Sequence, residues 1–403
     1  MGKKRVLYAI VGVVVMLFAG FVYAWSVLSS FIAADYPAWS SGSLSLTFTI
    51  CMAFFCLGGL ASGILSKRIA VRFNVIISAV LFFFGFSMAS RAFSLAGLYI
   101  GYGVLCGSAS GFAYNSVLNI MPRWFPDNPG LISGVLLMGF GSSSLIIGTM
   151  FTYFTSMEAG AWRDSFLFLG VLISITILVC SLFFKTPKPD EFLRTKESGD
   201  KNKNASDQGL ELSSGQMLRR SGFWTFFIWS TLLSGMGLAI IAQAKPIASM
   251  ISTGLSAGAI SLIVGLISVF NGLGRIIMGG MFDKSGRKIT MYAINIISLV
   301  CALLLIAALA LKSLPLVIAG FLGSGIAYGG CPTMSASFIR LFYGQKNYPV
   351  NLSVMNLNLL AASFFGTIAG ILYDASGSYM TTFIALTGCA LISLIILPRI
   401  KRP

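Results

Sequence analysis

Histidine is absent from the 403-residue chain, and acidic side chains are scarce, with 12 Asp and Glu in total. The absence of histidine removes the commonest metal ligand and the usual proton relay at physiological pH. No acidic residue lies deep in an apolar segment, so the sequence also lacks a buried carboxylate pair for acid–base chemistry. These absences argue against an enzyme and against a carboxylate proton relay.

Cysteine is present but shows no sign of metal or disulfide chemistry. The seven residues are odd in number, lie inside apolar segments and lack the paired spacing of metal ligands: Cys51, Cys56, Cys106, Cys180, Cys301, Cys331 and Cys389. We interpret them as buried thiols. The sequence therefore predicts no metal site and no cofactor.

Apolar residues dominate the chain. They make up 56% of it, and 44 glycines add to that share, which exceeds the composition of soluble domains. A helix that crosses the hydrocarbon layer needs about 20 mostly apolar residues. Twelve segments qualify, at residues 7–33, 44–66, 73–91, 95–120, 130–156, 164–184, 222–248, 257–282, 289–311, 314–338, 350–373 and 378–398. The first is longer than the apolar part of a signal peptide, so we predict that it is a retained helix.

Positive charge is concentrated on one side of these predicted spans. The net charge is +16, which would suggest a nucleic-acid partner if the basic residues formed one surface. Instead, 23 of the 28 Lys and Arg residues fall in the termini and loops of one side, which the positive-inside rule assigns to the cytoplasm. The sequence predicts a multi-pass protein with both termini in the cytoplasm and no nucleic-acid partner.

The spans fall into two sets of six. Residues 1–184 are expected to form an N-terminal bundle and residues 221–403 a C-terminal bundle. The polar residues 185–220 between them cannot bury a core and predict a flexible cytoplasmic linker.

Two short sequences recur in the two halves. Gly-Phe-Ala-Tyr at 111–114 is echoed by Gly-Ile-Ala-Tyr at 325–328, and GILSKRIAVR at 63–72 corresponds to GGMFDKSGRK at 279–288. The offsets of 214 and 216 agree closely. They indicate a duplicated six-helix unit, as in many transporters.

The sequence GGMFDKSGRK resembles the cytoplasmic loop motif of the major facilitator superfamily. The positions that match are Gly279, Asp283, Lys284, Gly286, Arg287 and Lys288. A glycine permits a tight turn, and the acid can pair with a basic group or a helix N-terminus in one conformation. The first-half copy has Lys67 where the acid belongs, so the two loops are not expected to act as equal conformational latches. The resemblance implies an all-α membrane protein of twelve helices in two pseudo-symmetric six-helix bundles, a monomer in the lipid bilayer.

Other pieces, scattered over the whole chain, resemble the oxalate–formate antiporter family and the related monocarboxylate transporters. They are Tyr23-Ala24-Trp25-Ser26, GFAYN at 111–115, Arg123-Trp124-Phe125-Pro126, Trp162-Arg163, Asn271 with Arg275, and the segment from Tyr373 to Tyr379. The resemblance to the bacterial members implies a carrier of small carboxylates in a prokaryotic inner membrane.

Arg275 is a charge inside a predicted span. Such charges are costly and normally face a cavity or a partner, although an arginine can also extend toward the interface. Ser261, Ser268, Asn271 and Arg275 share one helix face, which favours a cavity. A guanidinium can bind a carboxylate with two parallel hydrogen bonds. The resemblance implies the same role, since the family's arginine at this position anchors the substrate carboxylate.

Aromatic residues are the next candidates for a binding site. Tyr114 and Tyr328 hold equivalent positions among small neighbours, so they could face each other across the repeat interface and donate hydrogen bonds to one carboxylate. The alternative is a pair of core tyrosines. Tyr23 and Trp25 are weaker candidates, because aromatics are common in membrane helices.

One predicted span near the C-terminus carries two amide side chains and no charge. Asn351 and Asn358 are seven residues apart with Met355 between them on one face. This pattern fits a cavity lining and interhelical hydrogen bonds equally well.

Two departures from the resembled families narrow the substrate. The oxalate antiporters carry a lysine in the eleventh span, whereas residues 350–373 here contain no charge. The proton-coupled monocarboxylate transporters place an aspartate one turn before the arginine, where this chain has Asn271. One cation suits a monoanion. Coupling would then be exchange with a counter-anion, facilitated diffusion, or a proton carried by the substrate or by tyrosines.

Lys245 lies near the outer end of the seventh span, beside Gln243 and Pro246. We expect it to extend toward the membrane interface, as lysines near helix ends do. The alternative is that it attracts anions to the outer mouth.

Together these features predict a secondary carrier of small monocarboxylates of the lactate, pyruvate or formate kind, with Arg275, Asn271, Tyr114 and Tyr328 at its centre. The alternative within transporters is exchange of oxalate or another dicarboxylate against formate. An efflux carrier for lipophilic compounds is disfavoured because no buried acid is available to bind a cation. A membrane enzyme or sensor is disfavoured because the chain lacks residues for chemistry.

Overall fold

A computed structural model of the chain describes residues 2–66, 68–125, 129–155, 158, 160–185, 210–251, 254–344 and 347–400. Within these residues all regular elements are helical. They are α1 (Gly2–Ala19), η1 (Gly20–Ala24), α2 (Trp25–Asp35), α3 (Ser41–Leu65), α4 (Val71–Ser90), α5 (Leu95–Leu98), η2 (Tyr99–Cys106), α6 (Gly107–Trp124), α7 (Pro129–Gly141), α8 (Ser143–Phe154), α9 (Ala161–Ser181), α10 (Ser214–Leu218), α11 (Ser221–Ile251), α12 (Ala257–Leu311), α13 (Leu314–Tyr343), α14 (Tyr348–Met355), α15 (Asn358–Ser376), α16 (Met380–Ile396) and η5 (Leu397–Arg399).

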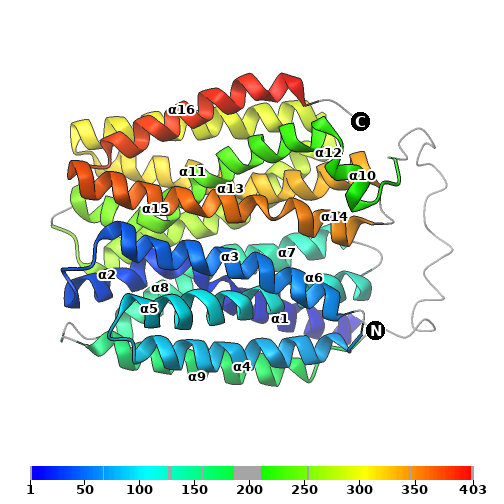
Figure 1. Ribbon diagram of the computed structural model, residues 1–403, viewed down its shortest axis with the longest axis horizontal. Coiled ribbons are helices and arrows are strands. Elements are labelled where there is room, and N and C mark those ends of the chain that lie inside the picture. The colour runs from blue at the N-terminus through cyan, green and yellow to red at the C-terminus, as the bar shows by residue number, and fades with distance from the viewer. Residues whose placement is uncertain are drawn as a thin grey trace.

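Twelve helical segments of the described chain are long and apolar enough to cross a membrane. This confirms the all-α fold with twelve predicted spans. Helices α1 to α9 occupy the lower half of Figure 1, and α11 to α16 occupy the upper half. We call the end that carries α10 and both termini the linker end. The opposite end, where the chain passes from α2 to α3, is called the distal end.

The helix α12 contains two of these spans, Ala257–Phe282 and Lys284–Leu311. The chain reverses between them at Gly286, whose backbone has φ 77° and ψ 173°. Residues other than glycine rarely adopt this conformation. The tight glycine turn expected of the GGMFDKSGRK loop is therefore present.

In each half, two helices cross with their backbones in contact. A side chain at Gly111 of α6 would overlap the carbonyl oxygen of Phe55 in α3, and one at Gly325 of α13 would overlap the carbonyl oxygen of Ile267 in α12. Small residues at a crossing let membrane helices approach closely. The crossings bring Tyr114 and Tyr328, three residues after each glycine, toward the centre of the molecule.

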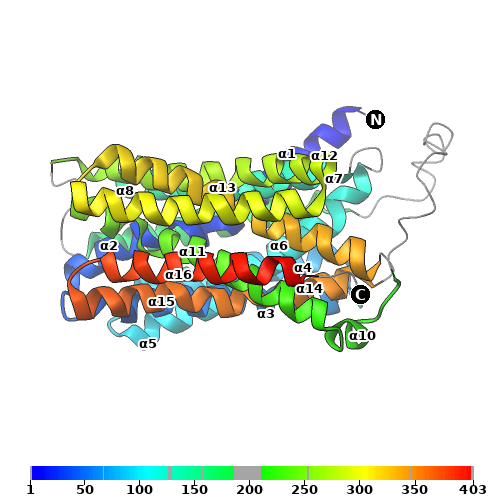
Figure 2. The same cartoon turned by 90° about the horizontal axis from the view of Figure 1, so that it is seen from above.

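The two sets of helices are joined by hydrogen bonds near the distal end. Helices α3 and α15 run side by side there (Figures 1 and 2). The Asp374 carboxylate of α15 accepts hydrogen bonds from the backbone N–H groups of Ser41, at 3.1 Å, and Gly42, at 2.8 Å. About two turns further along α3, the Thr49 hydroxyl donates to the Ser363 carbonyl at 2.8 Å. A carboxylate at a helix N-terminus is electrostatically favourable, so Asp374 stabilises contact between the halves.

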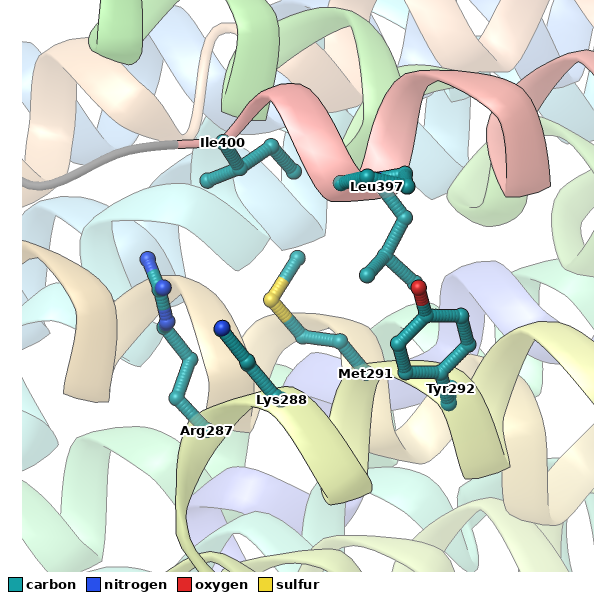
Figure 3. A pocket seen from close by; sticks show the side chains of 7 residues that line it. Arg287, Lys288, Met291, Tyr292, Leu397 and Ile400 are labelled. Carbon is teal, nitrogen blue, oxygen red and sulfur yellow. The ribbon is translucent and has the colours of Figure 1, made fainter.

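A small hollow of about 110 Å³ lies at the linker end, where α12 faces η5 (Figure 3). Its wall includes the basic side chains of Arg287 and Lys288 together with Tyr292. The hollow is formed by α12 beyond the Gly286 turn and by the end of the chain. Arg275 is not among the residues that line it.

Part of the predicted linker is ordered. Residues 186–209 lie outside the described residues, but α10 follows them, and its N-cap residue Ser213 forms a reciprocal capping box with Gln216. The end of the predicted linker thus contains a capped helix, and a flexible linker over 185–220 stays a prediction.

Candidate substrate site

The predicted polar face of α12 is buried inside the protein. Ser261, Asn271 and Arg275 are 0%, 0% and 4% exposed, whereas Leu262 and Ile276, on the other side of the helix, are about half exposed. The Ser261 hydroxyl pairs with the Thr152 hydroxyl of α8 at 2.8 Å, across the two halves. An arginine that reached the membrane interface would not be enclosed in this way. The burial argues against the alternative that Arg275 merely extends toward the interface.

Arg275 and Asn271 have unsatisfied hydrogen-bonding groups. The Nε and Nη1 atoms of Arg275, and both amide atoms of Asn271, have no hydrogen-bond partner among the described residues. A buried charge without a partner costs several kcal/mol even after the surroundings relax. Such groups therefore indicate a place where a ligand supplies the missing partners.

Tyr23 and Tyr328 meet across the two halves. Their hydroxyl oxygens are 3.1 Å apart, and either can donate to the other. Both side chains are buried, and their rings lie edge to face with centroids 6.0 Å apart. The Arg275 guanidinium is close enough to Tyr328 to interact with it electrostatically. The structure thus brings Tyr23, Tyr328 and Arg275 into one cluster.

Phe140 of α7 connects this cluster to Tyr114. Its ring centroid lies 5.4 Å from that of Tyr23 and 5.1 Å from that of Tyr114, and the Arg275 Cζ atom lies 6.0 Å from it. The distance to Arg275 is within the range of a cation–π interaction. Phe140 was missed at the sequence level. Its signal would have been the two small neighbours, Gly139 and Gly141, which resemble the setting of Tyr114.

Tyr114 does not face Tyr328 directly. It is partly buried and packs edge to face against Phe55 at 5.2 Å and against Phe140. The predicted symmetric pair of tyrosines is thus replaced by Tyr23 with Tyr328, and Tyr114 lies one aromatic ring further away. The reason is that Phe140 stands between the two halves at this level.

Three other predicted residues lie elsewhere. Trp25 packs against Tyr102 at 4.5 Å inside the first six spans. The Asn351 side chain donates to the Leu212 carbonyl and accepts from the Ser214 hydroxyl, so it anchors α10 at the linker end. Asn358 donates to the Ser230 hydroxyl at 2.8 Å, which makes it interhelical.

The structure does not bring Trp25 or Asn351 to the cluster around Arg275. Spacing along the sequence could not show this, because a span has several buried faces and only one of them lines the cavity. Met355 is fully buried and ends α14. The carbonyl of the next residue, Asn356, accepts from Cys56 of α3 at 3.5 Å. Met355 therefore lies near the contact between the halves.

The residues of the loop motif surround the Gly286 turn. Lys284 and Lys288 are exposed, and the Arg287 guanidinium lies over the Phe342 ring at 4.8 Å. Gly279 approaches the Thr333 side chain of α13. The side chains of Asp283 and Lys67 lie outside the described residues, so the predicted difference between the two latches stays a prediction.

The sequence model of the Major Facilitator Superfamily matches residues 8–243 and 227–403. The chain belongs to this superfamily. It is a multi-pass membrane transporter, like the relatives and solved structures that it resembles, and not an enzyme.

Among curated relatives, the oxalate:formate antiporter of Oxalobacter formigenes is 25% identical over 411 residues, which cover 99% of this chain and 93% of that protein. Monocarboxylate transporter 12 of Mus musculus is 22% identical over 367 residues, with 85% and 73% covered. These similarities confirm the relationship that the sequence motifs indicated.

Solved structures agree on the fold. The nucleoside transporter NupG superposes with a TM-score of 0.73 at 12% identity, covering 98% of this chain and 99% of that chain. The xylose transporter XylE from E. coli gives a TM-score of 0.71 at 14% identity, with 98% of each chain covered. At these identities the likeness concerns the fold alone.

Proposed function

We propose that the chain is a secondary carrier of small monocarboxylate anions, of the lactate, pyruvate or formate type, that works by alternating access. One observation carries the proposal: a buried arginine with two unpartnered guanidinium nitrogens lies beside a tyrosine pair that spans the two halves. A carboxylate would accept from Arg275 and from whichever hydroxyl of the tyrosine pair is not donating to the other, and charge-assisted bonds of this kind are the strongest in proteins.

The site has defined roles for its members. Arg275 holds the carboxylate, the remaining proton of the tyrosine pair completes its hydrogen bonds, and Asn271, one turn before Arg275, orients the guanidinium or a substrate hydroxyl. Phe140 and Tyr114 form an aromatic wall that limits substrate size, with Met355 as a further candidate for the wall. Residues 350–373 contain no second cation, which supports a substrate with one negative charge.

The orientation follows from charge. The linker end carries the excess of Lys and Arg, so we assign it to the cytoplasm of a prokaryotic inner membrane and the distal end to the outside. Hydrogen bonds through Asp374 and Thr49 then hold the outer side closed. Alternating access requires these contacts to break when the site opens outward. The carboxylates Asp35 and Asp374 are near the distal ends of their helices, which favours exchange or facilitated diffusion over a carboxylate proton relay.

Uptake by purified protein in liposomes tests the proposal. We expect Arg275→Ala to lower kcat/KM for labelled lactate about 100-fold, because the loss of one member of a buried charge pair costs a few kcal/mol. Arg275→Lys should remain strongly impaired, since a lysine cannot form the two parallel bonds. Arg91→Lys, at an exposed arginine of the distal end, is the matched control. Intact uptake by a folded Arg275→Ala protein would contradict the proposal.

A second candidate is exchange of oxalate against formate, favoured by the relative that bears this name and covers nearly the whole chain. Competition separates the two. If oxalate displaces labelled lactate at a concentration equal to or lower than that of unlabelled lactate, the dicarboxylate is favoured. If formate and pyruvate displace labelled lactate and oxalate does not, the monoanion is favoured.

A further inference from the structure

Lys245 is a buried cation that lies between the two halves. Its side chain is 8% exposed, and its Nζ atom lies 4.3 Å from the centroid of the Phe31 ring. No carboxylate lies within ion-pair distance of it among the described residues, and the Phe31 ring is the partner that the structure shows. The expectation that Lys245 extends to the membrane interface was wrong, because the side chain is enclosed by protein. A cation on a side chain that is 8% exposed, with no anion beside it, is costly.

The position of Lys245 relates it to the substrate site. Gly237 of α11 lies directly against the Tyr328 ring, and Lys245 follows eight residues later. On the other half, Phe31 follows Tyr23 by eight residues. Eight residues of helix rise about 12 Å, so Lys245 and Phe31 form a second level, closer to the distal end than the Tyr23–Tyr328 pair.

Two acidic residues of the distal end, Asp35 and Asp374, have hydrogen-bond partners of their own. Asp35, four residues after Phe31, accepts from the Gly160 N–H at 2.6 Å and from the Trp162 indole at 2.7 Å. Asp374 accepts from the start of α3. Gln243, two residues before Lys245, is held by the Tyr379 hydroxyl at 2.9 Å. Neither of these two carboxylates is paired with Lys245, and its charge is available to a group that is not part of the chain.

We infer that Lys245 forms a second anion site, which binds the carboxylate of the substrate on its way between the distal side and Arg275. Phe31 belongs to the first half and Lys245 to the second, so the ring covers the ammonium while the distal ends are joined. When the halves separate at this end, the ring leaves and the charge faces the outer entrance. This inference rests on the proposed function.

The chemistry of the two cations differs. The ammonium of a lysine is a compact charge without fixed orientation, whereas the guanidinium of Arg275 binds a carboxylate in one geometry. Lys245 thus collects small carboxylates without selecting among them, and Arg275 orients them. A cation–π contact is worth about 0.5–2 kcal/mol, so a carboxylate can replace the ring readily.

Transport from the two sides tests the site. In liposomes with the distal end outward, Lys245→Gln should raise the KM for lactate added outside about fivefold at low ionic strength. Lys245→Arg should stay close to wild type. The KM measured from the linker end should change less than twofold. Lys312→Gln removes an exposed distal lysine and is the control for general surface charge. An unchanged outer KM in Lys245→Gln would overturn the inference and leave the proposed function standing.

Chemical labelling tests the site without transport. A membrane-impermeant amine-reactive ester is applied to the wild-type protein and to Phe31→Leu, and acylation of Lys245 relative to Lys312 is measured by mass spectrometry. Phe31→Leu should raise the labelling of Lys245, because the covering ring is lost. Formate should lower the labelling of Lys245 more than chloride does at the same ionic strength. Equal effects of formate and chloride, or no labelling of Lys245 in either protein, would overturn the inference even if lactate were not transported.

Discussion

The two halves of the molecule use the same helix crossing to build different walls. With the offset of 216 residues, Asn271 and Arg275 of α12 correspond to Phe55 and Gly59 of α3. In the second half these positions are a buried amide and a buried guanidinium, and among the described residues both amide atoms and the guanidinium Nε and Nη1 have no hydrogen-bond partner. In the first half, Phe55 packs against Tyr114 at 5.2 Å. The duplicated scaffold provides the shape twice, and at this pair of positions only the second half carries a charge.

The largest effect is expected where the scaffold is common to both halves. Gly111→Val and Gly325→Val should each destabilise the protein by about 3 kcal/mol, because the new side chain overlaps a backbone carbonyl of the neighbouring helix. Thermal unfolding in detergent measures both. Gly388→Val, at a glycine with no atom within 4 Å of an added Cβ, should change little. If only one of the two variants lost stability, the two helix crossings would not be equivalent.

The next effect concerns the difference between the walls. Asn271→Leu should lower kcat/KM for lactate about tenfold, the cost of one hydrogen-bonding group in a buried charged site. Phe55→Leu, at the counterpart position, should lower it no more than about twofold, since an apolar wall is kept. Lactate uptake in liposomes checks this. Similar losses in the two variants would mean that the asymmetry of residues is not an asymmetry of function.

A smaller effect is expected where the halves meet at the distal end. Asp374→Asn should weaken the closed distal end by about 1 kcal/mol, since the charge at the α3 N-terminus is lost. Amide exchange at Ser41 and Gly42 should then rise about fivefold, measured by mass spectrometry of that peptide. Glu158→Gln, at an exposed distal acid, serves as the control. Unchanged exchange would show that Asp374 does not hold this end.

The smallest effect compares the two loops. Gly286→Ala should cost about 1 kcal/mol, because φ 77° strains any other residue. The counterpart is Ala70, where φ is −62°, so Ala70→Gly should cost about 0.5 kcal/mol or less. Thermal unfolding distinguishes the two. If Gly286→Ala is neutral, the turn does not require glycine and the two loops are alike.

The sequence was most informative where one physical constraint acts alone. The length of apolar segments predicted the twelve spans, and a glycine among charged residues predicted the turn at Gly286. The face shared by Ser261, Asn271 and Arg275 was readable because a helix has a fixed period. These features depend on local geometry and on the membrane as solvent.

Features that depend on the partner helix were harder to predict. Trp25 and Asn351 have the composition of cavity residues, but the choice between faces of a span is made by its neighbours, Tyr102 for one and the α10 segment for the other. Phe140 carries no charge, and its flanking glycines are a weak signal, so its role became visible only when the structure placed it near Arg275. The burial of Lys245 could not be predicted, because the Phe31 ring that covers it belongs to a helix more than 200 residues away in the sequence.

The hydroxyl pair of Tyr23 and Tyr328 has a consequence for the kind of solute that fits. Two phenols carry two protons, yet the bond between them uses one as a bridge. The other proton, the unpartnered nitrogens of Arg275 and the amide nitrogen of Asn271 are all donors. Among the unpartnered groups of Arg275 and Asn271, the donors outnumber the one acceptor, the Asn271 amide oxygen. Ammonium ions and polyamines, which only donate, find few partners there, and a group with several lone pairs and no proton of its own fits best.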